Sequence, residues 1–246
     1  MALVLAHAKY QLLEQIRIPM AVIGSTFFPA AAMLFFVVPF AGDHPVGATL
    51  ATASMTTFAA MSTSLFTFGI GVAEDRAQPW DPYLRTLPAG PFPRFAGRII
   101  AGLAMIGVSV VPVLIIAAVF TEAAVTPLRL LLGLAALAAG SVPFTLLGLT
   151  IGYALPSKAA IAVTQLVFFP MAVGGGLLSS PVDPPAFIQA IAPYLPSRGA
   201  VELVWTAVAP EVSPAPVTMV MLAVWTAAAG AAAVWAYRRD EGVRFS

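Results

Sequence analysis

The side chains that could perform chemistry are few in this chain, and they avoid its long apolar stretches. There is no cysteine, which excludes disulfides, thiolate metal ligands and cysteine nucleophiles. The two histidines, His7 and His44, are far apart in the sequence, and a lone histidine does not predict a metal site. A membrane-embedded hydrolase would also need a base within the apolar stretches. We therefore expect no catalytic residue, no metal site and no enzyme activity.

The chain also lacks a nucleotide-binding motif. A P-loop reads G-x-x-x-x-G-K-[ST] after a strand. The nearest match is Gly152–Ala159, in which Ser157 replaces the second glycine and Ala159 replaces the final Ser or Thr. The chain is therefore not expected to bind ATP by itself.

The densest group of charges lies between residues 74 and 98, where charged side chains alternate with five prolines. Prolines at both ends of residues 80–87 would bracket a short helix. Its spacing would turn Tyr83 and Leu84 toward a membrane and Asp81 and Arg85 toward water. An ordinary basic loop is the alternative, but it does not account for the acidic residues or for the prolines.

The elements that must position this segment are membrane-spanning helices. Six stretches of 23 to 29 residues contain no charged residue and no histidine. About 20 apolar residues cross a bilayer as a helix, and a central charge costs about 2.5–3.5 kcal/mol on insertion scales. Only 9% of the residues are charged. We predict an all-α membrane protein with six spans, from these stretches: Ile18–Gly42, Pro45–Ala73, Ile99–Thr121, Leu130–Ser157, Ala159–Val182 and Val212–Tyr237.

The basic residues indicate the orientation. With the N-terminus inside, the inner segments carry ten of the twelve Lys and Arg residues, and the outer segments carry only Arg129 and Arg198. Such a bias is typical of cytoplasmic loops. We predict a multi-pass protein of the cell membrane, the inner or plasma membrane, with both termini in the cytoplasm.

The remaining segments complete one transmembrane domain over residues 1–246. Residues 1–18 mix leucines with polar residues and predict a helix lying in the cytoplasmic interface, for which a frayed polar leader is the alternative. Residues 179–215 hold two apolar clusters separated by Pro193 and Pro196, too short to span. We predict two extracellular re-entrant or interfacial half-helices there. Gly148 and Gly152 form a G-x-x-x-G pair that could let another helix approach closely.

The charge-free spans exclude several transport mechanisms. Proton- and sodium-coupled carriers commonly use ionisable residues within their spans, and the six stretches contain none. Energy for transport would have to come from elsewhere.

The segment order resembles the membrane permease subunit of type-2 ABC exporters, of the daunorubicin-type drug-resistance family. An amphipathic N-terminal segment precedes six spans. The segment between spans two and three has the family's acidic-Arg start at Glu74–Arg76, a Leu-x-x-x-Pro at Leu84–Pro88 and a closing Gly97-Arg98. Residues 174–196 resemble the family's region before the last span. The segment between spans two and three departs from the family pattern, because Pro79-Trp80 and Pro82 stand near the places where the family commonly has Gly-Thr and a Glu.

The resemblance implies a permease that forms a dimer with a second copy or a paralogue and binds a soluble ABC ATPase. ATP and Mg²⁺ would be bound by that ATPase, and residues 73–98 would be the cytoplasmic coupling segment. The candidate coupling residues are Glu74, Asp75, Arg76, Asp81, Tyr83, Leu84 and Arg85.

The expected cargo is a hydrophobic or amphipathic small molecule, drug-like or lipid, because an apolar path favours such molecules. Heme or glycan cargo, and a non-transporting scaffold or immunity protein, are the alternatives. Membrane lipid is an expected partner and nucleic acid is not. Candidate path residues, which could equally face lipid or pack between helices, are Phe66, Phe68, Phe168, Phe169 and Met171.

Overall fold

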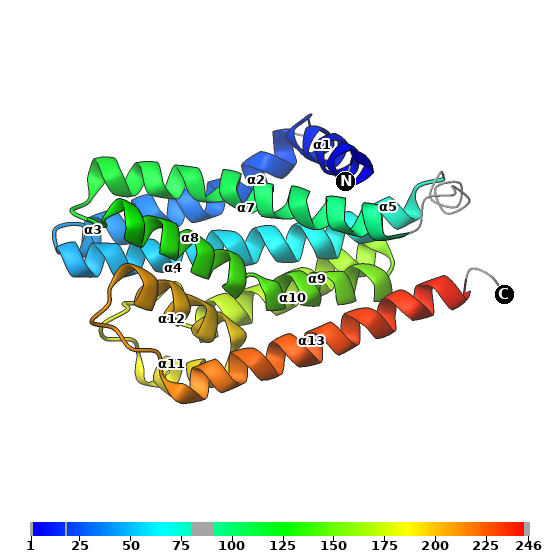
Figure 1. Cartoon of the computed structure of the whole chain (residues 1–246). Helices are drawn as coiled ribbons and strands as arrows, with labels where there is room; N and C mark the ends of the chain where they lie inside the picture. Colours follow the sequence, from blue (N-terminus) through cyan, green and yellow to red (C-terminus); the bar gives the residue numbers. More distant parts are fainter. Residues whose placement is uncertain (1, 18, 80–90, 244–246) are drawn as a thin grey trace.

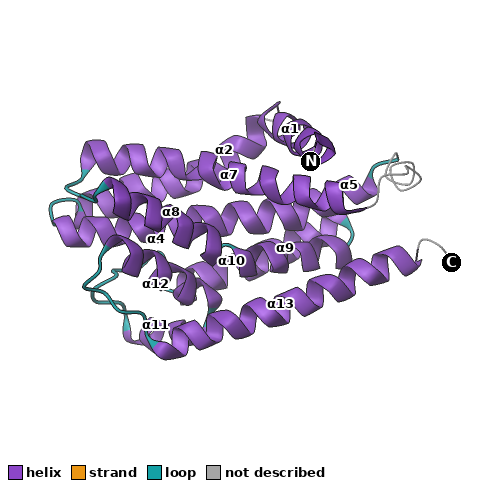
Figure 2. Cartoon of the chain, viewed as in Figure 1, coloured by secondary structure: helices purple, strands orange, loops and turns teal. Residues whose placement is uncertain are grey.

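A computed structural model describes residues 2–17, 19–79 and 91–243, and this part of the chain is helical with short connections. Figures 1 and 2 show long helices running side by side. The elements are α1 (Ala2–Arg17), α2 (Pro19–Ala32), η1 (Met33–Val37), α3 (Val38–Ala41), α4 (Pro45–Leu65), η2 (Phe66–Ile70), α5 (Gly71–Ala77), α7 (Pro91–Phe120), α8 (Pro127–Gly140), α9 (Val142–Ala154), α10 (Ser157–Gly174), α11 (Ala186–Ile191), η3 (Ala192–Tyr194), α12 (Pro196–Val208) and α13 (Pro216–Val243).

The two ends of the bundle differ. Both chain termini, α1 and α5 lie at one end, which we call the termini end (Figure 1). The α3–α4 and α7–α8 connections, α11 and α12 lie at the other, which we call the α12 end. All segments expected in the cytoplasm therefore share one end, as alternating spans require.

Five of the six predicted spans are confirmed as helices long and apolar enough to cross a membrane. They are Pro45–Ala77, Phe95–Phe120, Pro127–Ala154, Ser157–Gly174 and Pro216–Asp240. The first predicted span is helical from Pro19 to Ala41. Within it, the apolar helix Thr26–Ala41 is shorter than a membrane span. In the part of the chain that the structure describes, it therefore supports an all-α protein with five candidate spans and the shorter apolar helix Thr26–Ala41.

The helices on both sides of the predicted coupling segment, residues 73–98, extend into it. On one side, α4, η2 and α5 form one helix of 33 residues to Ala77, and on the other α7 begins at Pro91. Pro91 suits a helix start, because the missing N–H would have no partner there. Both spans thus extend into this segment as rigid helices.

The central helix is α4. Of its most apolar 18-residue window, 78% is buried, against 17% to 33% in the other four spans. It carries many hydroxyl side chains, and most of them donate to backbone carbonyls three or four residues earlier, which satisfies them inside the bundle. These residues are Thr49, Thr52, Ser54, Thr56, Thr57 and Ser62. Hydroxyl bonding within the helix explains how so polar a helix can be the core.

The first span contains a turn of π-helix, η1, at Met33–Val37. Pro39 follows four residues after Phe35, and a proline ring clashes with the carbonyl four residues before it. The wider π-turn moves this carbonyl away from the ring, so the helix continues through α3.

The G-x-x-x-G pair lies at a close helix contact, between α9 and η2. A Cβ atom at Gly152 would stand 2.5 Å from the backbone oxygen of Phe68, and one at Gly148 would stand 3.0 Å from that of Ser64. Small residues let membrane helices approach to backbone contact. The pair therefore sets the distance between the second and fourth spans.

We expect Gly152→Ala to destabilise the protein by about 1–3 kcal/mol, because overpacking forces the two backbones apart. Gly107→Ala is the matched control, since a Cβ there meets nothing within 4 Å. Alanine should stabilise that position by about 0.5–1 kcal/mol through helix propensity. Thermal unfolding followed by size-exclusion chromatography in detergent measures both. Equal melting temperatures for the two variants would show that the contact is not tight.

The N-terminal segment is a helix, as predicted. Figure 1 shows α1 at an angle to the bundle, next to the start of α7. A Cβ at Gly97 would stand 2.6 Å from His7 Cβ, so the two helices are in close contact there. The position of α1 in a membrane interface stays a prediction.

Candidate coupling and transport site

The structure separates the predicted coupling residues into two groups. Asp81, Tyr83, Leu84 and Arg85 lie outside the described residues. Glu74 is exposed on α5, whereas Asp75 pairs with Arg98 of α7 and Arg76 points into the bundle. Of the described members, only Glu74 presents its side chain mainly to the surface.

Arg76 joins three helices at the termini end. Its Nη1 donates to the carbonyl oxygens of Gly152 (2.7 Å) and Leu155 (3.2 Å), at the C-terminus of α9. Its Nε donates to Asp240 Oδ1 of α13 at 3.1 Å. A cation is favoured at a helix C-terminus, where carbonyls lack intrahelical partners. The side chain of Asp240 is only 3% exposed, so this arginine pairs with a buried carboxylate.

Aromatic rings support the same junction. Phe95 of α7, Tyr153 of α9 and Tyr237 of α13 contact one another, with ring centroids 4.8 to 6.0 Å apart. The guanidinium carbon of Arg76 lies 5.9 Å from the centroid of Tyr153, within cation–π range. Ser157, at the start of α10, donates to the carbonyl of Ala73 at 3.0 Å. Through these contacts α5 is bonded or packed to four other spans.

The candidate path residues do not form one surface. Phe168 and Met171 are buried, and Phe168 contacts Phe66 and Phe169 at centroid distances of 5.4 and 5.2 Å. Phe68 is buried elsewhere, close to Gly102 and Gly148. Phe169 is 55% exposed and Phe66 is half-buried. Only Phe66 and Phe169 could meet a substrate without a rearrangement of the core.

A buried ion pair that the sequence reasoning missed lies at the α12 end. Arg198 Nε donates to Glu202 Oε1 at 2.6 Å. Oε2 of Glu202 accepts from the Ala215 N–H at 3.0 Å and from the Thr218 hydroxyl. The side chain of Glu202 is only 7% exposed. The carboxylate thus ties α12 to the N-terminus of α13, where negative charge is favoured.

Trp205 continues this network to the central helix. Its indole N–H lies 2.9 Å from the carbonyl oxygen of Leu50 and 3.3 Å from Ser54 Oγ, both on α4. The guanidinium carbon of Arg198 lies 4.7 Å from its ring centroid. The signal in the sequence was the i, i+4 spacing of Arg198 and Glu202, which places both on one face of a helix. The burial of this ion pair depends on contacts with α13, which no local sequence pattern indicates.

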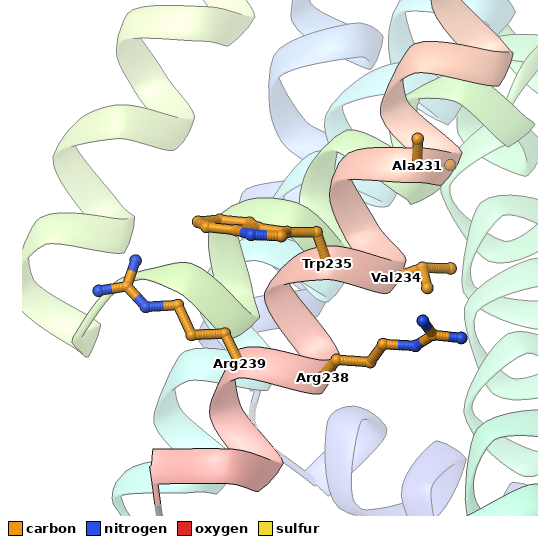
Figure 3. A pocket seen from close by; sticks show the side chains of 6 residues that line it. Ala231, Val234, Trp235, Arg238 and Arg239 are labelled. Carbon is orange, nitrogen blue, oxygen red and sulfur yellow. The ribbon is translucent and has the colours of Figure 1, made fainter.

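A shallow hollow on α13 has a volume of about 620 Å³ (Figure 3). Its lining comes from this helix alone, and Figure 3 shows Arg238 and Arg239 pointing to opposite sides of it. Arg239 lies over the exposed ring of Trp235, 5.4 Å from the centroid. One helix face cannot enclose a substrate, but Trp and Arg together are typical of a membrane–water interface. Among the described residues, no three His, Cys, Asp or Glu come together to hold a metal.

The comparison with known families decides the class of this helix bundle. A sequence model described as "ABC-2 type transporter" matches residues 2–208, from α1 to the end of α12. The chain belongs to the ABC-2 type transporter family. The predicted resemblance to a type-2 ABC permease is thereby confirmed. The match includes the α5–α7 segment and both short helices at the α12 end.

Part of the chain is also similar in sequence to a bacterial protein. The protein named "Putative transport permease YvfS" of Bacillus subtilis (strain 168) is 30% identical over 161 residues. This match covers 61% of the chain and 63% of that protein, which is less than two thirds of its length. The chain is thus a member of a transporter family, with several helices that could span a membrane.

Proposed function

We propose that this chain is the permease subunit of an ATP-driven exporter, which moves a hydrophobic or amphipathic small molecule or a lipid out of the cytoplasm or inner leaflet. A separate ABC ATPase would bind ATP and Mg²⁺ and dock at the α5–α7 segment, and two permease subunits would form the pathway. Membership of the ABC-2 family supports the class of this proposal. The burial of only 17% of the α13 window leaves a face for lipid or for a second subunit.

The observation that carries the coupling proposal is the Arg76 junction. A displacement of residues 78–90 by an ATPase would act directly on the ends of α5 and α7. The Arg76 and Ser157 bonds would pass it to α9, α10 and α13. Asp75 and Arg76 therefore transmit movement inside the permease, and Glu74, Asp81 and Arg85 would meet the ATPase.

The distribution of basic residues supports a cytoplasmic termini end. Among the described residues, Arg76, Arg98, Arg238 and Arg239 lie at this end, whereas Arg129 and Arg198 lie at the α12 end. Cytoplasmic loops carry an excess of Lys and Arg. In this orientation α11 and α12 are the two outer half-helices, and the contacts of Trp205 with α4 support a position for α12 inside the bundle.

Apolar cargo is supported by the chemistry of the exposed helix faces. Phe169, Leu166 and Val173 of α10 are all exposed. We place Phe66 and Phe169 on the path and the more deeply buried Phe68, Phe168 and Met171 behind it.

We expect charge reversal at Glu74, Asp81 and Arg85 together to abolish copurification of the ATPase while the spans stay inserted, because these side chains are expected outside the hydrocarbon. Tagged permease is isolated in mild detergent, and subunits with a Walker A sequence are detected by mass spectrometry. The loss should be steepest at low salt, where charges are screened least.

Charge reversal at Arg238 and Arg239 is the control, since both are exposed on α13. Asp240 is left unchanged, because it is bonded to Arg76. Docking at the α5–α7 segment would be refuted if the Arg238 and Arg239 variant lost the ATPase while the variant of the α5–α7 segment kept it. If no ATPase accompanied the unmodified permease, the non-transporting scaffold would be favoured instead.

A further inference from the structure

A second cavity lies near the α12 end, away from the Arg76 junction and from Phe66 and Phe169. It has a volume of about 280 Å³ between α4, α7, α8 and α12. Its inner wall includes Ala53, Leu137 and Val204, which are buried. Its volume lies just below the range of about 300–1,000 Å³ for drug-sized ligands. The cavity therefore fits part of a slender apolar molecule.

The cavity opens sideways between α7 and α8. Ala118, Val125 and Leu134 line it and are exposed, so they form its mouth. The surrounding helix surface is also apolar, since Ile115 and Leu131 are 57% and 65% exposed. Exposed aliphatic residues on a spanning helix face hydrocarbon. The medium at the mouth is therefore lipid.

The polar atoms of the lining do not call for a polar ligand. Thr49, Thr52 and Thr56 are its hydroxyl residues, and each donates its proton to a carbonyl of α4. The remaining lining is aliphatic or glycine. An alkyl chain can occupy such a site without leaving a buried donor unpaired.

A cation lies beside the rim. Arg129 follows the first residues of α8, next to the lining residue Leu130, and its Nη1 donates to the carbonyl of Ala207, next to the lining residue Val208. Arginine can bind a phosphate and still keep another hydrogen bond, because the guanidinium has five N–H donors.

We propose that this cavity binds one acyl chain of a membrane phospholipid, which enters between α7 and α8 while its phosphate lies at Arg129. The site is separate from the transport path and goes beyond the proposed function. It would fill a void in the bundle and hold α12, and with it the Trp205 contact, against α4.

The test uses the full-length permease in nanodiscs that contain phosphatidylglycerol with a photoreactive diazirine at the end of one chain. Labelled residues are located by mass spectrometry. We expect label on the inner wall, at Leu137, Val204 and Leu114. Ala118→Phe should reduce this label about fivefold or more, the equivalent of roughly 1 kcal/mol, because the ring blocks the mouth. Ala135→Phe is the matched control on an exposed position of α8 outside the lining, and it should change nothing.

A diacylglycerol probe with the same photoreactive chain tests the phosphate contact. Phosphatidylglycerol should label the inner wall about fivefold more, since one arginine near anionic headgroups contributes roughly 1 kcal/mol, and Arg129→Gln should remove this preference. Label confined to outward residues such as Ile115, inner-wall label unaffected by Ala118→Phe, or equal labelling by both probes would overturn the assignment. Neither ATPase nor cargo is needed, so this test and that of the proposed function fail independently.

Discussion

Replacing Arg76 with alanine is expected to destabilise the permease by about 3–5 kcal/mol, because the substitution removes a guanidinium that pairs with a buried carboxylate. The carboxylate is that of Asp240, and the C-terminal carbonyls of α9 lose their donor as well. For a chain of this size, the loss corresponds to a fall in melting temperature of about 10 °C or more. The measurement is thermal unfolding of the purified permease in mild detergent, followed by size-exclusion chromatography.

Two further variants separate the ion pair from a general loss of charge. Arg238→Ala removes an exposed arginine at the same end and should change the melting temperature little. Combining Arg76→Ala with Asp240→Ala should recover part of the stability, because the buried carboxylate that paired with the arginine is then removed as well. A double variant as unstable as the sum of the two single variants would show that the two residues are not coupled. If the proposed function holds and the double variant folds, lost stimulation of the proposed ATPase by cargo would support a role of the junction in transmitting movement.

Replacing Glu202 with glutamine is expected to destabilise the protein by about 3 kcal/mol or more, although the two side chains have nearly the same shape. The carboxylate accepts hydrogen bonds on both oxygens, from Arg198 on one side and from Ala215 and Thr218 on the other. An amide has only one oxygen, so its NH₂ group must face a donor on one of the two sides. Either orientation leaves a buried donor unpaired and loosens α12 from α13.

Glu211→Gln is the control for this substitution, since Glu211 is exposed on the connection between α12 and α13. Its melting temperature should match that of the unmodified chain. Fluorescence of the buried Trp205, measured in a chain whose other three tryptophans are replaced by phenylalanine, gives a second readout, because its indole packs beside Arg198 and bonds to α4. An unchanged melting temperature in Glu202→Gln would mean that the carboxylate does not secure the half-helix.

Local features of the sequence were enough to predict the class of this protein, five of its spans and the common end for its termini. Charges are expensive in hydrocarbon wherever a span lies in the fold, so their absence from Leu130–Ser157 or Val212–Tyr237 is a local signal. The family resemblance also rested on local motifs, such as Glu74–Arg76 and Gly97-Arg98. These features require no knowledge of which helices are neighbours.

The contacts of individual residues, by contrast, became visible only in the folded chain. Asp75 and Arg76 read as surface charges of a loop, because the sequence does not show that Arg98 and Asp240 lie beside them. From the sequence, Glu202 was expected in an outer connection. In the structure, the backbone N–H of Ala215, thirteen residues later at the start of α13, is one of its hydrogen-bond donors. In the same way, Phe68 faces Gly102 and Gly148 and not a path. Helix periodicity indicates which residues share a face, but burial and charge pairing depend on contacts between helices that are distant in the chain.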